Sequence, residues 1–203
     1  MGRWAPGAGD RLREAALALY LERGFEQTMV TDIAERAGVT ARTFFRHFAD
    51  KREVLFDGTS ALTESSLAAL EAAPATASTL EVVAAALDAA ADMIGRDREL
   101  ARKRQSVIMS NTDLRERELI KIASLSATLA DGLRRRGVDA TEAGLAAEAA
   151  CAVYRVAFQR WVDADDGLDL RDAIGQSFAQ LRALTAAGYP RTACSSEAPS
   201  SSA

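Results

Sequence analysis

The residue types that carry most enzyme chemistry are scarce in this sequence. Its 203 residues include one histidine, His47, and two cysteines, Cys151 and Cys194. A zinc cluster, a disulfide framework or a serine, histidine and aspartate triad needs these residue types in larger numbers or at closer spacing. We therefore expect no catalytic residue, no metal site and no cofactor, and we interpret Cys151 as a small buried apolar residue.

Basic and hydroxyl side chains gather instead in residues 40–51, TARTFFRHFADK. At the start of a short helix, such side chains can reach the hydrogen-bonding groups on DNA base edges, and an arginine can pair with guanine. We expect base contacts from the first turn and the turn after it, namely Thr40, Ala41, Arg42, Thr43 and Arg46. An arginine on that face meets a phosphate about as readily as a base, so both partners stay open for Arg42.

A second set of side chains near the same helix is suited to phosphate contacts. The ring of Phe45, the imidazole of His47 and the ammonium group of Lys51 are expected along the rim, where they can fix the register of the helix without reading sequence. Thr31, placed at the start of the preceding helix, can add its hydroxyl and its backbone N–H. Together these residues form the predicted DNA-contact site.

Two short helices joined by a glycine turn must hold these side chains. In residues 30–48, VTDIAERAGVTARTFFRHF, Thr31 and Thr40 are suited to cap the two helices, and Gly38 is suited to the turn. The small side chain of Ala34 permits a close crossing. The apolar residues that would seal the pair against a preceding helix are Ile33, Ala37, Val39, Phe44 and Phe48. The pattern predicts a helix-turn-helix.

The whole chain has a helical composition. Alanine supplies 43 of the 203 residues and the four prolines leave two long proline-free stretches, so we predict an all-α fold of about nine helices. The helices are predicted near residues 10–24, 31–37, 41–48, 51–71, 80–94, 100–110, 114–136, 141–164 and 170–184. The fourth is predicted to run without a break from Lys51, because Asp50 can cap it and Glu53 completes a capping box.

The charge and hydropathy of the chain limit its partners. The net charge is −4, and residues 1–57 carry nine basic and nine acidic side chains. A nonspecific nucleic-acid coat usually has a strongly basic surface, so this charge favours a compact DNA-reading element instead. The sequence has no apolar run of the ~20 residues that cross a bilayer and no apolar core of a signal peptide near its start. We expect no membrane partner and a cytoplasmic location.

Residues 10–57 resemble the DNA-binding domain of TetR-family transcriptional regulators. The motifs that carry the resemblance are GF at residues 24–25, TDIAERAGV at 31–39, FFRHF at 44–48 and DKREVL at 50–55. The hydroxyl and basic groups of Thr43, His47 and Lys51 match the family pattern. The family has a tyrosine where this chain has Phe45, so ring packing replaces a phenol hydrogen bond to phosphate.

The resemblance implies a homodimer on double-stranded operator DNA, usually a repressor that a small molecule releases. Two recognition helices would then lie about 34 Å apart. The late helices supply an apolar face for dimerisation, with the candidates Leu145, Tyr154, Phe158, Trp161, Ile174, Phe178 and Leu181. We expect DNA binding from residues 1–57, ligand binding and dimerisation from residues 58–189, and a disordered tail over residues 190–203.

Residues 98–161 also resemble the C-terminal domain of actinobacterial TetR-like regulators related to the mycofactocin regulator. Some of these respond to long-chain acyl-CoA, which implies a hydrophobic or acyl-CoA-like effector. Arg102, Arg104 and residues 134–136 would then meet phosphate groups, although arginines also suit a solvated face or the dipole at a helix end. The expected cavity lining is Met93, Arg102, Ile108, Met109, Leu125, Leu129, Tyr154, Phe158 and Trp161.

Other functions stay open at this point. A ligand-independent DNA-binding protein or an activator would carry the same helix-turn-helix. A helical enzyme that uses the cavity for catalysis is a remote third interpretation, because the sequence has no recognisable pair of nucleophile and base. An ordinary helical hairpin with charged outer residues would share some of the spacing in residues 30–55. A closed apolar cavity with a few polar groups would favour the ligand-responsive regulator.

Overall fold

The computed structural model describes residues 7–165 and 167–186. Within these ranges the chain forms nine α-helices and one short 3-10 helix, with no β-strand, which confirms the predicted all-α fold. These elements are α1 (Ala8–Arg23), α2 (Val30–Arg36), α3 (Ala41–His47), η1 (Glu53–Phe56), α4 (Thr59–Ala72), α5 (Thr79–Ile94), α6 (Arg98–Met109), α7 (Thr112–Arg135), α8 (Ala140–Asp163) and α9 (Leu170–Ala186). None of the described helices is long and apolar enough to span a membrane. The predicted tail, residues 190–203, lies outside the described residues.

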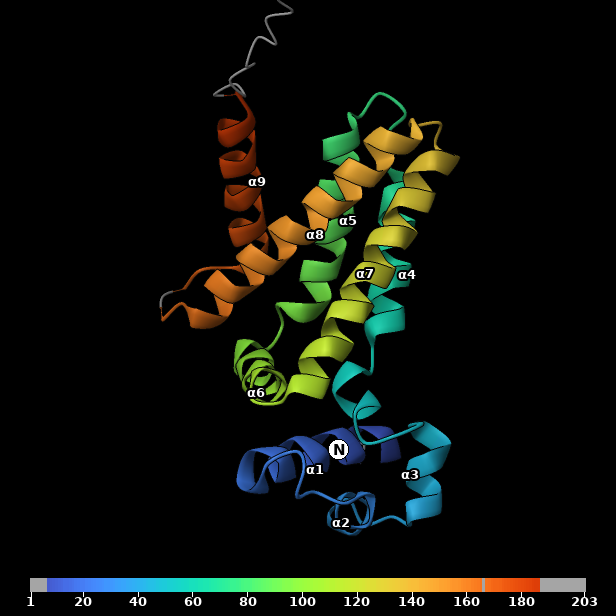
Figure 1. Cartoon of the computed structure of the whole chain (residues 1–203), viewed down its shortest axis with the longest axis vertical. Coiled ribbons are helices and arrows are strands. Elements are labelled where there is room, and N and C mark those ends of the chain that lie inside the picture. Colours follow the sequence, from blue (N-terminus) through green and yellow to red (C-terminus); the bar gives the residue numbers. More distant parts are fainter. Residues whose placement is uncertain (1–6, 166, 187–203) are drawn as a thin grey trace, which may run out of the picture.

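Helices α1 to α3 form a small bundle at one end of the molecule, the lower end in Figure 1. Its centre contains fully buried side chains such as Leu12, Ile33 and Phe44. Burying a side chain of this size stabilises a fold by about 1.5–3 kcal/mol. On the outside, the Arg36 guanidinium donates two hydrogen bonds of 2.9 and 2.8 Å to the Glu22 carboxylate, which ties α2 to α1. The bundle therefore holds α3 on a core of its own.

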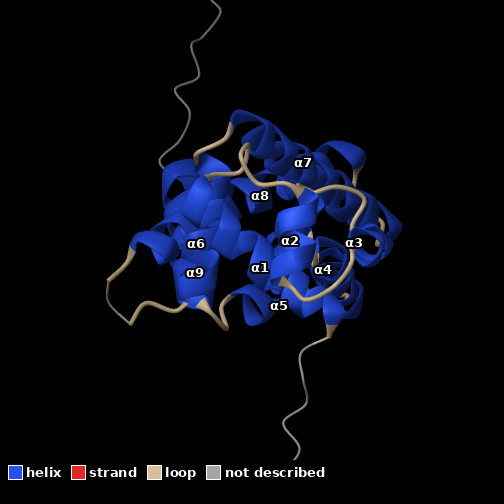
Figure 2. Cartoon of the chain, turned by 90° about the horizontal axis from the view of Figure 1, so that it is seen from below, coloured by secondary structure: helices blue, strands red, loops and turns tan. Residues whose placement is uncertain are grey.

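Helices α4, α5, α7, α8 and α9 form the larger part, the body of the molecule (Figure 1). Helices α4 and α7 pack closely because α7 carries Gly132, where a β-carbon would lie 2.9 Å from Leu67 Cδ1. Side chains from α8 and α9, among them Trp161 and Ile174, are buried in the centre of the body. Seen from below, the small bundle lies in front of this body (Figure 2).

Helix α6 and the start of α7 connect the body to the small bundle. Val107, Ile108 and Leu114 are buried in the same apolar cluster as Leu12 and Phe56. This face of α6 therefore packs on the small bundle. The expectation that Ile108 lines a cavity is corrected, because the side chain is used in the core that joins the two parts.

The predicted fourth helix is interrupted. Asp50 does act as a cap, since its carboxylate accepts hydrogen bonds from the backbone N–H groups of Arg52 and Glu53 at 2.7 and 3.0 Å. The chain then forms only η1, and Gly58 adopts a left-handed conformation with φ +87° before α4 begins. An α-helix cannot continue through a residue in this conformation. The single helix predicted over residues 51–71 is therefore corrected to two elements with a joint at Gly58.

Candidate functional site

The turn between α2 and α3 has the predicted geometry. Gly38 has φ +66°, and the next backbone N–H, that of Val39, donates to the Ala34 carbonyl at 2.9 Å. Ala34 is 2% exposed, so its small side chain lets the two helices cross at close range. The pair forms a helix-turn-helix.

Helix α3 is held at its start and along its inner side. The Thr40 hydroxyl oxygen accepts a hydrogen bond from the Thr43 backbone N–H at 3.2 Å, which caps the helix as predicted. Phe44 and Phe48 are buried with ring centroids 5.5 Å apart. Because the inner side is fixed in the core, the outer side of α3 is presented to solvent in a defined orientation.

The outer side of α3 carries the side chains expected to contact DNA. Arg42 and Arg46 are exposed, and Phe45 is 58% exposed although it is apolar. These three residues lie three and four positions apart and so share one helix face. His47 is also exposed, whereas Thr40 caps the helix and turns towards its backbone. This arrangement presents two guanidinium groups and an aromatic ring together on a short helix.

Thr31 lies two positions further into its helix than the predicted cap position. Helix α2 begins at Val30 with Met29 at the N-cap, and the Met29 backbone N–H donates to the Asp32 carboxylate at 3.2 Å. The capping role predicted for Thr31 is therefore corrected. The residue is exposed in the first turn of α2, where backbone N–H groups have no partner within a helix, so its phosphate contact stays a prediction.

Lys51 has a structural role that differs from the predicted one. Its ammonium group donates to the backbone carbonyls of Phe25, Glu26 and Thr28 at 2.9, 3.3 and 3.0 Å. The Tyr20 hydroxyl donates to the Lys51 carbonyl at 2.6 Å, which fixes the lysine at its backbone as well. An ammonium group has three protons, so all of them are used here. The expected phosphate contact of Lys51 is corrected to a support for the loop between α1 and α2.

A cavity of about 420 Å³ lies between η1 and the helices α4 to α8. Small-molecule sites in proteins usually measure about 300–1,000 Å³. Apolar side chains dominate its wall, among them Leu62, Leu87, Ile94, Ile122, Leu125 and Phe158. This is the kind of cavity that favours a ligand-responsive protein.

Charged and polar side chains enter the cavity wall near η1. The Arg104 guanidinium pairs with the Glu118 carboxylate at 3.3 Å, and both residues line the cavity. Tyr154 lines it from α8, and burial raises the pKa of its phenol to about 12. A phenol is neutral near pH 7 even at its ordinary pKa, and the raised pKa keeps the proton of Tyr154 in place in alkaline solution as well.

The structure places some of the predicted cavity residues on the wall and others elsewhere. Those on the wall are Met93, Leu125, Tyr154 and Phe158. Met109 is exposed at the end of α6, and Leu129 and Trp161 are buried in the core of the body. These three expectations are corrected, because apolar spacing along a helix does not distinguish a cavity wall from a filled core.

Two of the arginines that were expected to meet phosphate groups, Arg102 and Arg136, bind backbone carbonyls near the ends of helices. Arg102 donates to two backbone carbonyls at the C-terminal end of α8, at 2.9 and 3.1 Å. Arg136 donates to the carbonyls of Glu71 and Pro74 at 3.1 and 2.9 Å, next to the end of α4. The expectation of phosphate contacts is corrected for Arg102 and Arg136, since backbone oxygens already use their donors, whereas Arg134 and Arg135 pair with the carboxylates of Asp131 and Glu71. Of the predicted arginines, Arg104 lies on the cavity wall.

The predicted dimer residues divide in the same way. Ile174 and Phe178 are buried inside the protomer, and Leu181 packs partly buried against the same core. Helix α9 therefore buries Ile174 and Phe178 within the chain, which corrects the expectation for these two residues, while a dimer contact of Leu181 stays a prediction. Leu145 is 68% exposed, and Val156 on the same helix, α8, is 52% exposed. An exposed apolar surface is thus present on α8.

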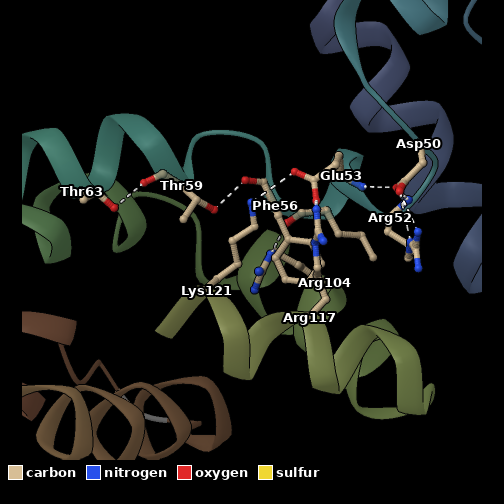
Figure 3. A network of polar contacts seen from close by, with 10 residues as sticks. Asp50, Arg52, Glu53, Phe56, Thr59, Thr63, Arg104, Arg117 and Lys121 are labelled. Atoms are coloured by element: carbon tan, nitrogen blue, oxygen red, sulfur yellow. Dashed lines mark hydrogen bonds and ion pairs between the residues drawn. The ribbon is translucent and has the colours of Figure 1, made fainter. Parts of the chain in front are cut away.

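Polar contacts join the cavity wall to η1 (Figure 3). The Arg104 Nε atom donates to the Leu55 carbonyl at 2.6 Å. The Glu53 carboxylate accepts hydrogen bonds from Arg117 Nε at 2.7 Å and from Lys121 Nζ at 3.2 Å, both on α7. Glu53 was expected to complete a capping box, and its side chain instead binds the body. The connector η1 is therefore held from α6 and from α7.

Several residues of this region are not predicted by the sequence analysis. Glu118, Lys121 and Ser66 lie on the cavity wall, and each is one polar residue among several on a helix, with no local signal that marks it. Gly58 did carry a signal, because an Asp-Gly pair inside a helical pattern is a turn sequence.

Two family models match the chain. The model for bacterial regulatory proteins of the tetR family matches residues 12–57, from α1 to the end of η1. The model for the MftR C-terminal domain matches residues 77–186, which is more than half of the chain.

Two named relatives match this chain, one over less than half of its length and the other over most of it. The HTH-type transcriptional regulator TcmR of Streptomyces glaucescens is 46% identical over 90 residues, which are 44% of this chain and 38% of TcmR. The chain thus matches well under half the length of that relative. The putative mycofactocin biosynthesis transcriptional regulator MftR of Mycobacterium tuberculosis is 24% identical over 181 residues, 88% of this chain and 91% of that protein.

Solved structures share the fold over nearly the whole chain. FadR of Thermus thermophilus, a TetR-family transcriptional repressor in complex with lauroyl-CoA, has a TM-score of 0.54 at 24% identity, with 95% of this chain and 100% of that chain covered. The fatty acid degradation regulator FadR of Bacillus halodurans has a TM-score of 0.59 at 19% identity, over 88% and 96% of the two chains. The helix-turn-helix, the helical body and both family matches together show that this chain belongs to the TetR family of bacterial transcription regulators, with a C-terminal domain of the MftR type.

Proposed function

We propose that this protein is a homodimeric repressor that leaves its operator when a hydrophobic small molecule binds the body. Residues 1–57 bind the DNA, and residues 58–189 bind the effector and the second protomer. The protein acts in the cytoplasm and catalyses no reaction. The observation that carries the proposal is the position of the cavity, whose wall includes Leu55 and Phe56 of η1, the connector between the two parts.

A hydrophobic effector follows from the wall of the cavity. Apolar side chains from α4, α5, α7 and α8 enclose most of it, and burying an apolar ligand there removes its surface from water. FadR of Thermus thermophilus holds lauroyl-CoA, and FadR of Bacillus subtilis holds stearoyl-CoA. These two complexes support an acyl compound as the first class of effector to test.

The path from effector to DNA runs through η1. A molecule that displaces Arg104 or Phe56 would move η1, because both the carbonyl of Leu55 and the ring of Phe56 rest against that guanidinium. Just after η1, Asp57 pairs with Arg13 on α1, so a shift of η1 is passed to the small bundle. An effector releases DNA only if it binds more tightly to the conformation in which α3 is misplaced.

The DNA contacts follow from the exposed face of α3. Arg42 and Arg46 are suited to base edges or phosphates, and Phe45 to the sugar-phosphate backbone beside them. A second protomer, joined through the exposed apolar surface of α8, would place its own α3 about 34 Å away on a near-palindrome. His47 and Thr31 then contact phosphates that fix the register.

A reciprocal titration tests the proposal. Lauroyl-CoA and stearoyl-CoA are titrated into the protein with and without labelled operator, and coenzyme A alone is the control. Coupling in regulators is typically about 5–150-fold, and we expect the operator to weaken acyl-CoA binding by the same factor by which acyl-CoA weakens operator binding. Identical acyl-CoA affinity with and without operator would contradict the proposal. The protein would then be a DNA-binding protein that acyl-CoA does not regulate. A reporter gene under the operator then separates repression from activation.

A further inference from the structure

The cavity wall contains a hydroxyl group, that of Ser66, which is buried without a hydrogen bond. Ser66, in the middle of α4, lines the cavity and is 1% exposed. Among the residues that the structure describes, none provides a hydrogen-bond partner for its Oγ atom. A buried hydroxyl without a partner is costly, and in a ligand site such a group fixes the place of a polar atom of the ligand.

This hydroxyl differs from comparable hydroxyls on other turns. Thr63, on the same helix, and Ser177, buried on α9, each donate to the backbone carbonyl four residues earlier, at 3.0 and 2.8 Å. That carbonyl is the usual internal partner of a helical serine or threonine. Ser66 does not use it. Gln105 also has a buried oxygen without a partner in the described part of the chain, but it does not lie on the cavity wall.

Helix directions place Ser66 at the end of the cavity that is furthest from η1. In Figure 1, α4 and α7 run away from the small bundle, and α5 runs back towards it. On each of these helices, one lining residue lies furthest from η1. These residues are Ser66 on α4, Leu125 on α7 and Leu87 on α5. Ser66 lies seven positions after Thr59, which corresponds to about 10 Å along the helix. The surroundings of the Ser66 hydroxyl at this end are therefore mainly apolar.

The opposite end of the cavity is charged. Arg104, Glu118 and Lys121 line it next to η1. The cavity thus has a charged end, a mainly apolar wall that also carries the hydroxyls of Thr63 and Tyr154, and the unpaired hydroxyl of Ser66 at the far end of its α4 side. A plain saturated chain would fit the middle but would leave Ser66 without a partner, whereas an oxygen atom near the far end of the chain would supply one.

We propose that the effector is an amphipathic molecule whose apolar skeleton carries a ketone or hydroxyl oxygen at the end remote from its polar head, and that Ser66 selects this oxygen by a hydrogen bond. The inference rests on the proposed function, because it names the chemistry of the effector for the same cavity. Ser66 is then the residue that separates an oxygenated chain from a saturated chain of equal length. A single neutral hydrogen bond of this kind corresponds to a preference of about three- to tenfold.

A matched pair of probes tests this selection. Binding of decanoic acid and of 10-hydroxydecanoic acid to the full chain is measured by calorimetry for the wild type, for Ser66→Ala and for the control Ser177→Ala. We expect the wild type and Ser177→Ala to bind the hydroxy acid about three- to tenfold more tightly than decanoic acid. We expect Ser66→Ala to lose this preference or to reverse it.

The variants also report on the hydroxyl without any ligand. Ser66→Ala removes an unpaired buried hydroxyl, so the variant is expected to melt at or above the wild-type temperature. Ser177→Ala removes a hydrogen-bonded hydroxyl and is expected to melt below it. Equal wild-type affinity for the two acids, a preference that survives in Ser66→Ala, or no binding of either acid overturns the inference. The proposed function is decided separately, by release of the operator with acyl-CoA.

Discussion

The Nε atom of Arg104 donates to the backbone carbonyl of Leu55 at 2.6 Å, so a residue of the cavity wall on α6 directly holds η1. The same guanidinium lies 5.2 Å from the centre of the Phe56 ring. The chain continues from η1 into Asp57, whose carboxylate pairs with Arg13 on α1. One arginine therefore contacts the cavity and the connector, and the connector contacts the DNA-binding bundle.

Replacing Arg104 by lysine is expected to uncouple effector from operator. Lysine keeps the positive charge but lacks the planar group that donates to Leu55 and stacks on Phe56. We expect the mutual weakening of acyl-CoA and operator to fall towards onefold, while operator affinity without ligand changes less. Reciprocal titrations measure both. Arg102→Lys, on the same helix but bound to the end of α8, is the control, and unchanged coupling in Arg104→Lys would refute this path.

Lys51→Met is expected to lower stability without removing a phosphate contact. The substitution leaves three backbone carbonyls of the loop between α1 and α2 without their donor, at a cost of about 1–3 kcal/mol. Thermal unfolding measures this loss. The dependence of operator affinity on salt should keep its slope, whereas loss of a phosphate contact reduces the slope by about one. A reduced slope at an unchanged melting temperature would contradict this prediction, because it would show that Lys51 contacts a DNA phosphate.

Gly58→Ala is expected to strain the joint between η1 and α4. Gly58 has φ +87°, and a β-carbon there would meet no described atom within 4 Å, so the effect comes from the backbone alone. The left-handed conformation costs an alanine about 1–2 kcal/mol. Gly144→Ala is a matched control, because that glycine lies within α8 with open space and alanine should stabilise it by about 0.5–1 kcal/mol. Shifts of the same sign in denaturant unfolding would contradict the assignment of the joint.

Asp88→Asn is expected to stabilise the protein near pH 7 and not in acid. Burial raises the pKa of the Asp88 carboxyl, an effect that Arg171 partly opposes and Asp92 reinforces. A carboxyl group whose pKa is raised by folding ionises less readily in the folded state than in the unfolded state. The folded state is therefore favoured in acid, and this stability is lost as the pH rises through the folded-state pKa. The gain in melting temperature should therefore shrink as the pH falls from 7 towards 4. Asp92→Asn, which removes the pair with Arg171, should show no gain at pH 7, and a gain for Asp88→Asn that is equal at both pH values would oppose the assignment.

The helix-turn-helix could be predicted from the sequence because its signals are local. The Thr40 hydroxyl caps α3, Gly38 makes the turn, and the apolar spacing of Phe44 and Phe48 fixes which side is buried. The break at Gly58 was missed because a capping signal at Asp50 favoured a continuous helix. A glycine preceded by aspartate was a competing signal of the same local kind.

The partners of long side chains could not be predicted, because they come from distant parts of the chain. Lys51 binds carbonyls more than twenty residues earlier, and Arg102 binds carbonyls about sixty residues later. The apolar spacing of Ile174 and Phe178 fits a dimer face as well as a core, and only the packing of α9 decides between them. Ser66 had no sequence signal, since its lack of a partner is a property of the folded cavity.

The measurement that tests the central claim most directly is fluorescence anisotropy of the full chain on the DNA upstream of its own gene, at two salt concentrations. It compares the wild type, the Arg42→Ala, Arg46→Ala double variant, and Arg171→Ala, a control that removes an arginine from the body. We predict that the wild type and Arg171→Ala bind this DNA more tightly than random DNA. The double variant should lose about 1–3 kcal/mol of binding free energy for each base contact removed. Binding by the double variant equal to that of the wild type would contradict the account, because α3 would not be the element that reads the DNA.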